Sequence, residues 1–256
     1  MKKIISSITL LFCGMMMANA QIADGFYHIQ NAGTGRYISI NDTDPSNYPV
    51  SQSGSVNLAG IRTYINYDSV AVSPSCVLYV KQLGNGKYDF VGQGSSLYAM
   101  TQEKLPVDLT SMGNGTYRIH GSYKGFTKQL TDKSPSDKDG NLVNTETGQI
   151  YWTFKPIDTS NEYIGIRPDV KTADGAYYGT IFAGFNFRFV SPGMIAYYVS
   201  NAGGTGFEMK EIDSDIIPAN TPVIIRCNSA NPQDNKIDPV IGGYTLDEVN
   251  WLGGVY

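Results

Sequence analysis

The sequence is poor in the residues from which enzymes build active sites. It has two histidines and three cysteines among 256 residues, and only 16% of its residues are charged. A catalytic histidine needs a nucleophile and an orienting partner within reach. His28 and His120 instead lie in short alternating strand-like stretches, and the chain has no Gly-x-Ser-x-Gly, His-Glu-x-x-His or phosphate-binding glycine motif. We therefore expect no catalytic residues and no enzymatic activity.

Clustered metal ligands are also scarce. The chain has no Cys-x-x-Cys motif and no Cys/His cluster, which argues against a structural zinc site. Residues 137–141 resemble the start of a calcium loop, but Glu146 comes too early to be its bidentate ligand. Three pairs of acids lie in loops rich in Ser, Asn, Pro and Gly: Asp42 and Asp44, Asp137 and Asp139, and Asp213 and Asp215. We interpret them as solvated turn acids rather than glycosidase pairs, and we expect no metal and no other cofactor.

The one long apolar run is at the N-terminus. Lys2 and Lys3 precede an apolar stretch over residues 4–17, which is too short to span a bilayer. Ala18-Asn19-Ala20 follows with the small-x-small pattern of a cleavage site. This order predicts that residues 1–20 are a signal peptide and that the protein is secreted, cell-surface or periplasmic.

Two alternatives remain for this segment, namely a buried N-terminal helix and a lipoprotein signal with Cys13 as the lipidated residue. After cleavage Cys76 and Cys227 remain, about 150 residues apart. An oxidising compartment permits one disulfide between them, and two separately buried thiols are the alternative.

Basic residues are few in the mature chain. Without Lys2 and Lys3, 17 basic residues stand against 23 acidic ones, a net charge of −6. Such a protein is a poor partner for nucleic acids or anionic membranes. No later segment reaches the roughly 18 apolar residues of a transmembrane segment. We expect neither partner, and the oligomeric state stays open.

Tyrosine, phenylalanine and glycine are abundant, with 18 Tyr, 10 Phe and 28 Gly, and no stretch keeps a helical period over three turns. This composition indicates an all-β protein. Residues 78–90 align without a gap with residues 107–119. In each copy apolar and polar residues alternate, a turn follows at Asn-Gly, and the alternation resumes at a tyrosine, as in a β-hairpin. Residues 152–157 with Asn161-Glu162-Tyr163 form a looser third copy with one residue inserted.

Three strand–turn–strand openings are interleaved with these hairpins. They are Gly25–Asn31 into Tyr37–Ile40, Tyr88–Val91 into Leu97–Met100, and Tyr117–His120 into Phe126–Leu130. Three pseudo-equivalent units of four strands predict a β-trefoil over residues 21–168, and a β-sandwich with similar hairpins is the alternative. The uneven spacing of the repeats predicts a long loop over residues 41–75 in the first unit.

A family resemblance supports the trefoil. Tyr27-x-Ile29-x-Asn31 followed by Thr34-Gly35-Arg36-Tyr37-Ile38 resembles the opening of a ricin-type β-trefoil lectin unit. Trp152-x-Phe154-x-Pro156 resembles the closing aromatic strand of that family, and the resemblance covers residues 24–168. The Gln-x-Trp signature of the family is absent, because Gln149-Ile150-Tyr151-Trp152 has one residue too many.

The resemblance implies a carbohydrate-binding, lectin-like protein with its sites beside the second strand of each unit. Carried over by position, the ligand-binding residues are Asn41, Asp42 and Tyr48 in the first unit, Tyr98 and Gln102 in the second, and Gln129 and Asp132 in the third. Tyrosines that pack strands and polar residues that cap turns are the alternative. The expected partner is a glycan or polysaccharide.

The rest of the chain follows another pattern. We expect a polar linker over residues 169–175 and a β-sandwich-like domain over residues 176–256, because short strands alternate with tight turns. Ala196–Val199, Glu211-Ile212, Ile217–Thr221 and Val223–Ile225 resemble a module of exported proteins of Bacteroidetes-type bacteria. The final residues, 251–256, predict an incoming strand, which either closes the sandwich or marks a truncated sequence.

Two other functions remain as alternatives to carbohydrate binding. The first is a structural or protein-binding role, as an accessory module or adhesin of an exported assembly. The second is that the chain is the non-catalytic part of a longer hydrolase.

Overall fold

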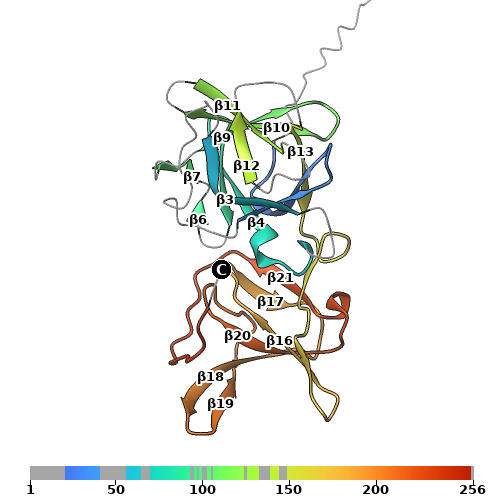
Figure 1. The fold of residues 1–256 in the computed structure, drawn as a ribbon, viewed down its shortest axis with the longest axis vertical. Coiled ribbons are helices and arrows are strands. Elements are labelled where there is room, and N and C mark those ends of the chain that lie inside the picture. The colour runs from blue at the N-terminus through green and yellow to red at the C-terminus, as the bar shows by residue number, and fades with distance from the viewer. Residues whose placement is uncertain are drawn as a thin grey trace, which may run out of the picture.

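The computed structural model describes residues 21–40, 56–64, 70–92, 95–96, 98–99, 103–104, 106–123, 126–132, 139–143 and 149–254. These residues fold into two stacked β units (Figure 1). The predicted signal peptide and Cys13 lie outside the described residues. Within the described part, no helix is long and apolar enough to cross a membrane.

A closed ring of six antiparallel strands forms the centre of the first unit. In ring order the strands are β1 (Gly25–Asn31), β4 (Leu78–Gly84), β5 (Lys87–Gly92), β9 (Val107–Ser111), β10 (Tyr117–Tyr123) and β13 (Tyr151–Pro156). Each pairs with the next, and β13 pairs with β1 to close the barrel. Closure leaves the barrel without an open sheet edge.

The strand register repeats three times around this barrel. Within each of the three trefoil repeats, the tyrosine of the first strand lies opposite the first core residue of the fourth strand. The pairs are Tyr27 with Leu78, Tyr88 with Val107, and Tyr117 with Trp152. Between neighbouring trefoil repeats, Tyr27, Tyr88 and Tyr117 lie opposite Pro156, Gln82 and Ser111 respectively. This pseudo-threefold register confirms the β-trefoil and excludes a sandwich for the first unit.

Aromatic side chains fill the barrel. Phe154 makes edge-to-face contacts with Tyr27, Phe90 and Tyr117 at ring-centroid distances of 6.0, 5.7 and 5.4 Å. Trp152 is fully buried, and its Nε1 donates a hydrogen bond to the Leu130 carbonyl at 3.2 Å. The indole is therefore buried with its one polar group satisfied.

Three hairpins extend from the barrel. The first trefoil repeat contributes β2 (Tyr37–Ile40) and β3 (Val56–Tyr64). The second repeat contributes β6 (Ser95–Ser96), β7 (Tyr98–Ala99) and β8 (Glu103–Lys104). The third repeat contributes β11 (Phe126–Thr131) and β12 (Asp139–Val143). Strands β7 and β12 both pair with β3, which joins the three hairpins. The long loop expected over residues 41–75 therefore contains a strand, β3.

The third copy of the repeat ends differently from the prediction. Strand β13 pairs with β1, so Tyr27 takes the position that Tyr88 and Tyr117 hold in the other hairpins. Tyr163 lies in the connection to the second unit, after a turn in which the Asp158 carboxylate accepts backbone hydrogen bonds from residues 160–162. The expected hairpin to Tyr163 was wrong because the last strand of a trefoil closes onto the first.

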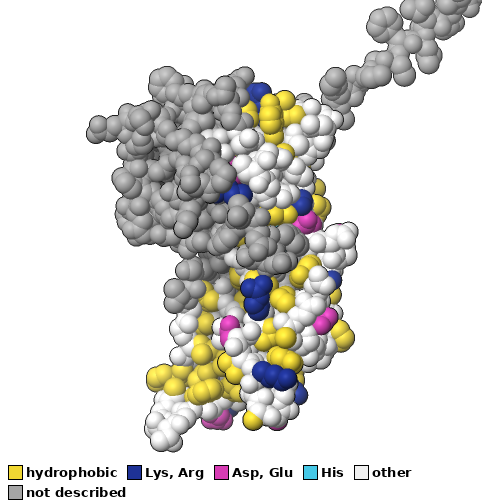
Figure 2. Space-filling model, turned by 45° about the vertical axis from the view of Figure 1, so that its right-hand side comes forward, with side chains coloured by type: hydrophobic (Ala, Val, Ile, Leu, Met, Phe, Trp, Pro, Cys, Tyr) yellow, Lys and Arg dark blue, Asp and Glu magenta, His cyan; other side chains and the backbone are white. Residues whose placement is uncertain are grey.

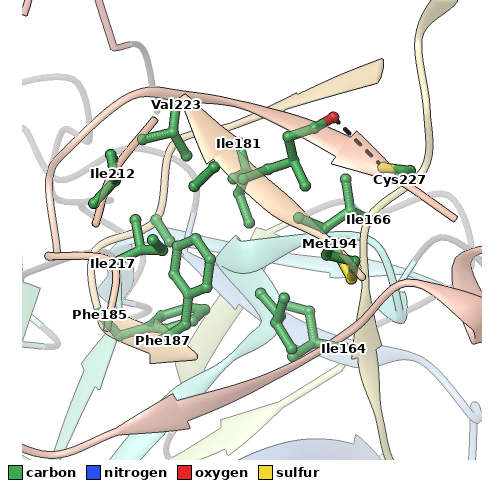
Figure 3. Packing of buried hydrophobic residues seen from close by; sticks show 14 of the residues in the cluster. Ile164, Ile166, Ile181, Phe185, Phe187, Met194, Ile212, Ile217, Val223 and Cys227 are labelled. Atoms are coloured by element: carbon green, nitrogen blue, oxygen red, sulfur yellow. Dashed lines mark hydrogen bonds between the residues drawn. The ribbon is translucent and has the colours of Figure 1, made fainter. Parts of the chain in front are cut away.

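Two sheets make up the second unit and confirm its β-sandwich-like fold. One sheet contains β14 (Ile164–Gly165), β21 (Lys236–Val240) and β17 (Asn186–Phe189) in spatial order. The other contains β15 (Val170–Lys171), β16 (Tyr177–Ile181), β20 (Val223–Cys227), β18 (Ile195–Gly203) and β19 (Gly206–Glu211). Figure 3 shows the core of this unit, in which aliphatic side chains surround Phe185 and Phe187.

The expected linker over residues 169–175 contains a strand. Val170 and Lys171 form β15, which pairs with Tyr178 and Tyr177 of β16. Both residues of β15 are exposed, because it is the edge strand of its sheet. A two-residue, solvent-exposed edge strand has the polar composition of a linker, which explains the difference.

The two units share an apolar contact. The rings of Phe26 from β1 and Phe185 lie 6.0 Å apart, and Val77 is part of the buried core of the second unit. The backbone N–H of Gly165 donates a hydrogen bond to the Ala71 carbonyl at 2.8 Å. The sandwich therefore packs directly on the barrel.

Both described cysteines are free thiols in separate buried sites. Burial raises the pKa of Cys76 to about 12 and that of Cys227 to about 11. Of the two alternatives left by the sequence, the structure shows two buried thiols. High thiol pKa values make both poor nucleophiles.

The chain after β21 makes no described strand. Asn250 holds this segment against β18: its Oδ1 accepts from the Val199 and Leu252 backbone N–H groups, and its Nδ2 donates to the Pro222 carbonyl. The Trp251 N–H donates to the Val199 carbonyl at 2.9 Å. The predicted incoming strand is thus replaced, up to Gly254, by an irregular segment fixed by an asparagine.

Candidate functional site

Most ligand-binding residues predicted by position fall where the structure gives no side chain. Asn41, Asp42, Tyr48 and Gln102 lie outside the described residues, and Tyr98 is described only as part of β7. Gln129 and Asp132 of the third trefoil repeat are fully described. The contacts of these two residues show whether their polar groups face solvent or lie inside the protein.

Asp132 has a structural position. Its side chain is fully buried and forms an ion pair with Arg36, whose Nε donates to Oδ2 at 2.8 Å and whose Nη2 donates to Oδ1. The Thr34 hydroxyl also donates to Asp132. The Asp132 carboxylate therefore joins the first trefoil repeat to the third from inside the protein.

The Asn31 to Arg36 stretch of the first opening motif forms a turn. The Asn31 Oδ1 accepts from the backbone N–H groups of Gly33 and Thr34 at 2.9 and 3.0 Å, and its Nδ2 donates to the Gln149 carbonyl at 2.7 Å. Gly35 has a φ of +73°, which favours glycine. The Thr34-Gly35-Arg36 motif thus shapes the turn and supplies both partners of Asp132.

Gln129 lies at the edge of a more open surface. Its side chain is 7% exposed and lies opposite His120 in the β10–β11 pair. Its Oε1 has no hydrogen-bond partner among the described residues. A buried amide oxygen without a partner is costly, so Gln129 is the least satisfied polar group on this side of the barrel.

Outward-facing side chains on four adjacent barrel strands, together with Gln129 on the hairpin strand β11, form what we call the barrel-wall surface. It comprises Lys87, Asp108, Thr110, Arg118, His120, Gln129 and Tyr151. Alternation explains the placement: Tyr117 and Ile119 enter the core, so the intervening Arg118 and the following His120 point outward.

Strand register arranges these side chains in two rows. The first row crosses β5, β9, β10 and β11 through Lys87, Asp108, His120 and Gln129. The second crosses β9, β10 and β13 through Thr110, Arg118 and Tyr151. Residues opposite one another in paired strands are close enough to contact one ligand together.

The contacts within the rows leave polar and aromatic groups accessible. The Lys87 Nζ lies 2.5 Å from the Asp108 Oδ2, and these side chains are 41% and 40% exposed. The Thr110 Oγ1 lies 2.7 Å from the His120 Nε2. The Arg118 guanidinium carbon lies 5.8 Å from the centre of the Tyr151 ring, and Tyr151 is 37% exposed. The surface thus combines an aromatic ring with hydrogen-bond donors and acceptors.

The surroundings of His120 lower its pKa and so favour the neutral imidazole. Partial burial lowers its pKa and outweighs the nearby Asp108 carboxylate, which raises it, while Arg118 and Lys87 lower it further. A neutral imidazole has one donor and one acceptor nitrogen. His120 can therefore serve a ligand hydroxyl in either role without an ionic partner.

The matching outward face of β1 is covered. Phe26 contacts Phe185 of the second unit, and the Nδ1 of the buried His28 lies 3.2 Å from the Glu162 Oε2. No group of three or more His, Cys, Asp or Glu among the described side chains could hold a metal ion. By contrast, Asp108 and Tyr151 of the barrel-wall surface are 40% and 37% exposed.

The sequence prediction missed most of this surface. The carried-over residues followed the second strand of each trefoil repeat, whereas this surface is built on barrel strands, with Gln129 of β11 as the one residue in common. The usable signal was the alternation in the aligned repeats, since Asp108 and Thr110 follow the core residue Val107 at outward positions.

Comparisons with known proteins add little to this picture. No family model matches the chain, and no curated protein matches it. Among solved structures, the chain is similar to the designed 3-fold symmetric protein ThreeFoil, with 17% identity and a TM-score of 0.38 over 52% of this chain and 100% of that one. The trefoil assignment rests on the strand register described above.

Proposed function

We propose that this protein is an exported carbohydrate-binding protein without catalytic activity, and that it contacts its glycan through the barrel-wall surface. One observation carries the proposal: exposed Tyr151, with Arg118 over its ring, lies beside a row of hydrogen-bonding side chains. Sugar rings stack their C–H faces on aromatic rings. Their hydroxyls pair with carboxylates, amides and imidazoles.

The lectin-like motifs and the predicted signal peptide also support this function. The Tyr27-x-Ile29-x-Asn31 opening resembles ricin-type units, and the module around Ala196–Val199 resembles exported Bacteroidetes-type proteins. The absence of catalysis is part of the proposal. It is supported by the position of His28, which is fully buried beside Glu162, and by the high thiol pKa values.

A structural or protein-binding role in an exported assembly is the second candidate. The observation that favours it is the set of large apolar side chains exposed on the second unit, among them Phe207, Val249 and Trp251 at 62, 71 and 61%. Exposed apolar groups of this kind mark contact sites when they lie together. A role as the non-catalytic part of a longer hydrolase is compatible with either binding function.

The test is glycan binding by the purified chain from residue 21 onward. An array of plant, host and microbial glycans would identify ligands, and calorimetry would compare Tyr151→Ala with Tyr244→Ala. Tyr244 is a tyrosine of similar exposure, 45% against 37%, in the second unit. We expect Tyr151→Ala to weaken binding about tenfold, which is about 1.4 kcal/mol, because the ring contact is lost.

The control variant should bind like the parent chain. Silence across the array would overturn the proposed function. Equal losses in the two variants would place the site elsewhere and overturn the assignment to the barrel wall.

A further inference from the structure

A groove of about 440 Å³ lies in the second unit, away from the barrel-wall surface. It runs between the end of β17, the start of β18 and the segment after β19. Its floor is apolar: Met194, Ala196 and Ile212 belong to the buried core, and half-buried Phe189 packs against that core. The buried core lies beneath the groove, while the exposed lining of the groove is mostly polar and open to solvent.

The rim of this groove carries negative charge without compensation. Glu211, Asp213 and Asp215 are exposed and line the groove. None of these three carboxylates makes a hydrogen bond or ion pair with another described residue. Arg188 also lines the groove, but its Nε and Nη2 both donate to the Asp238 Oδ2, at 3.0 and 2.7 Å. The groove is therefore complementary to a cation.

An open strand edge adjoins the groove. Strand β19 ends the five-stranded sheet, so the outer edge of its backbone has no strand partner in the described sheet. Alternation puts Phe207 and Met209, which are 62% and 38% exposed, on the same face as Glu211 at the rim. Figure 2 shows hydrophobic side chains gathered at the lower end of this unit. An exposed edge of this kind accepts an added strand.

We propose that the groove and the edge of β19 together bind a basic, extended segment of a partner polypeptide. A lysine or arginine side chain of the partner enters the rim formed by Glu211, Asp213 and Asp215. The partner backbone pairs with β19, and its apolar side chains cover Phe207 and Met209. Backbone hydrogen bonds give affinity in strand addition, and side-chain pockets give specificity. This site is independent of the glycan site proposed above.

The test uses two fluorescein-labelled peptides, Gly-Lys-Val-Lys-Leu-Gly and the same peptide with Glu in place of Lys. Fluorescence anisotropy would follow their binding to the chain from residue 21 onward. We expect the lysine peptide to bind, and to bind several-fold more weakly when salt rises from about 50 to about 300 mM, since salt screens an exposed charge contact. We expect the glutamate peptide not to bind.

Two double variants with the same change in net charge separate a site from general attraction. Asp213→Asn/Asp215→Asn alters the rim, whereas Asp247→Asn/Glu248→Gln alters exposed acids of the same unit that do not line the groove. We expect the rim variant to weaken binding about tenfold and the other to leave it within about twofold. Equal losses, or no binding of the lysine peptide by the parent chain, would overturn the proposal.

A third variant tests the strand edge. Phe207→Ser removes an exposed apolar contact of β19, and we expect it to weaken the peptide about fivefold. A polyamine, spermidine, serves as a cation without a peptide backbone. If spermidine competes as well as the lysine peptide and Phe207→Ser changes nothing, the ligand is a small amine and the proposed strand addition is wrong.

Discussion

Asp132 and Arg36 form a buried ion pair, with side chains 0% and 3% exposed. Removing two charges from water costs several kcal/mol each, so such a pair persists only with close geometry and additional hydrogen bonds. Thr34 supplies one of these bonds. At this scale, burial separates Asp132, which joins distant parts of the trefoil, from half-exposed Asp108 on the barrel-wall surface.

The first prediction compares these two aspartates. Asp132→Ala should lower the free energy of unfolding by about 3–5 kcal/mol, because it leaves the Arg36 guanidinium buried without its carboxylate. Asp108→Ala breaks a half-exposed pair with Lys87 and should cost less than about 1 kcal/mol. Urea denaturation of both variants measures the difference. A cost for Asp132→Ala no larger than that for Asp108→Ala would contradict the structural role.

Sequence alone could identify the type of residue at such sites but not its environment. Gln129 lies in the strand Phe126–Thr131 and Asp132 directly follows it, and both carry groups that bind sugars, so both were reasonable ligand candidates. Only the fold brings Arg36 to Asp132 across 96 residues, and only the register brings Tyr151 beside Arg118. Contacts between residues far apart in sequence depend on strand pairing, which local patterns do not specify.

At the scale of elements, the aligned tyrosines predicted strand pairing well. Tyr88 and Tyr117 occupy equivalent registers, as the gap-free alignment of residues 78–90 and 107–119 required. Prediction was wrong where a strand had a distant partner or lay at an edge. Strand β13 closes onto β1, and β15 consists of two exposed residues, so neither shows a local hairpin signal.

Asn250 makes several of the hydrogen bonds that hold the irregular segment after β21. Asn250→Ala should remove three hydrogen bonds, to Val199, Leu252 and Pro222. Because the Val199 amide loses its partner, we expect its hydrogen exchange to speed up by about tenfold, with a loss of about 1–2 kcal/mol in unfolding free energy. Hydrogen-exchange mass spectrometry over residues 195–203 reads this out.

The matched control for this prediction is Asn201→Ala. Asn201 is exposed on β18, and its side chain makes no hydrogen bond with other described residues. We expect it to leave exchange in residues 195–203 and the midpoint of unfolding nearly unchanged. If both variants exchanged equally fast, the segment would owe its position to Leu246, which packs against the core, rather than to Asn250.

At the scale of the whole molecule, a polar cluster accompanies the apolar contact between the two units. Glu162, in the connection between them, accepts from His28 of β1 at 3.2 Å, and the Lys155 Nζ lies 3.1 Å from its Oε1. Lys155 also donates to the Tyr37 hydroxyl at 2.8 Å. The cluster fixes the connection on the barrel, so it couples the position of the second unit to the charge of Glu162.

This coupling predicts a pH dependence. Burial raises the pKa of Glu162, but hydrogen bonds from His28 and Lys155 outweigh it and hold the pKa below its usual value of 4.5. A lowered folded-state pKa contributes stability that is complete above the usual value and is lost as pH falls through the folded-state value. Thermal unfolding of the parent chain should therefore shift to lower temperature as pH falls below about 4.5.

Glu162→Gln should be less stable than the parent chain at neutral pH, and its melting temperature should fall less over the same acid range, because the titrating group is gone. Glu208→Gln, which alters an exposed acid of β19, should keep the parent pH profile. Calorimetry of the three proteins from pH about 7 to about 3 makes the comparison. Parallel profiles for all three would mean that acid acts on other carboxylates and that Glu162 does not hold the connection to the barrel.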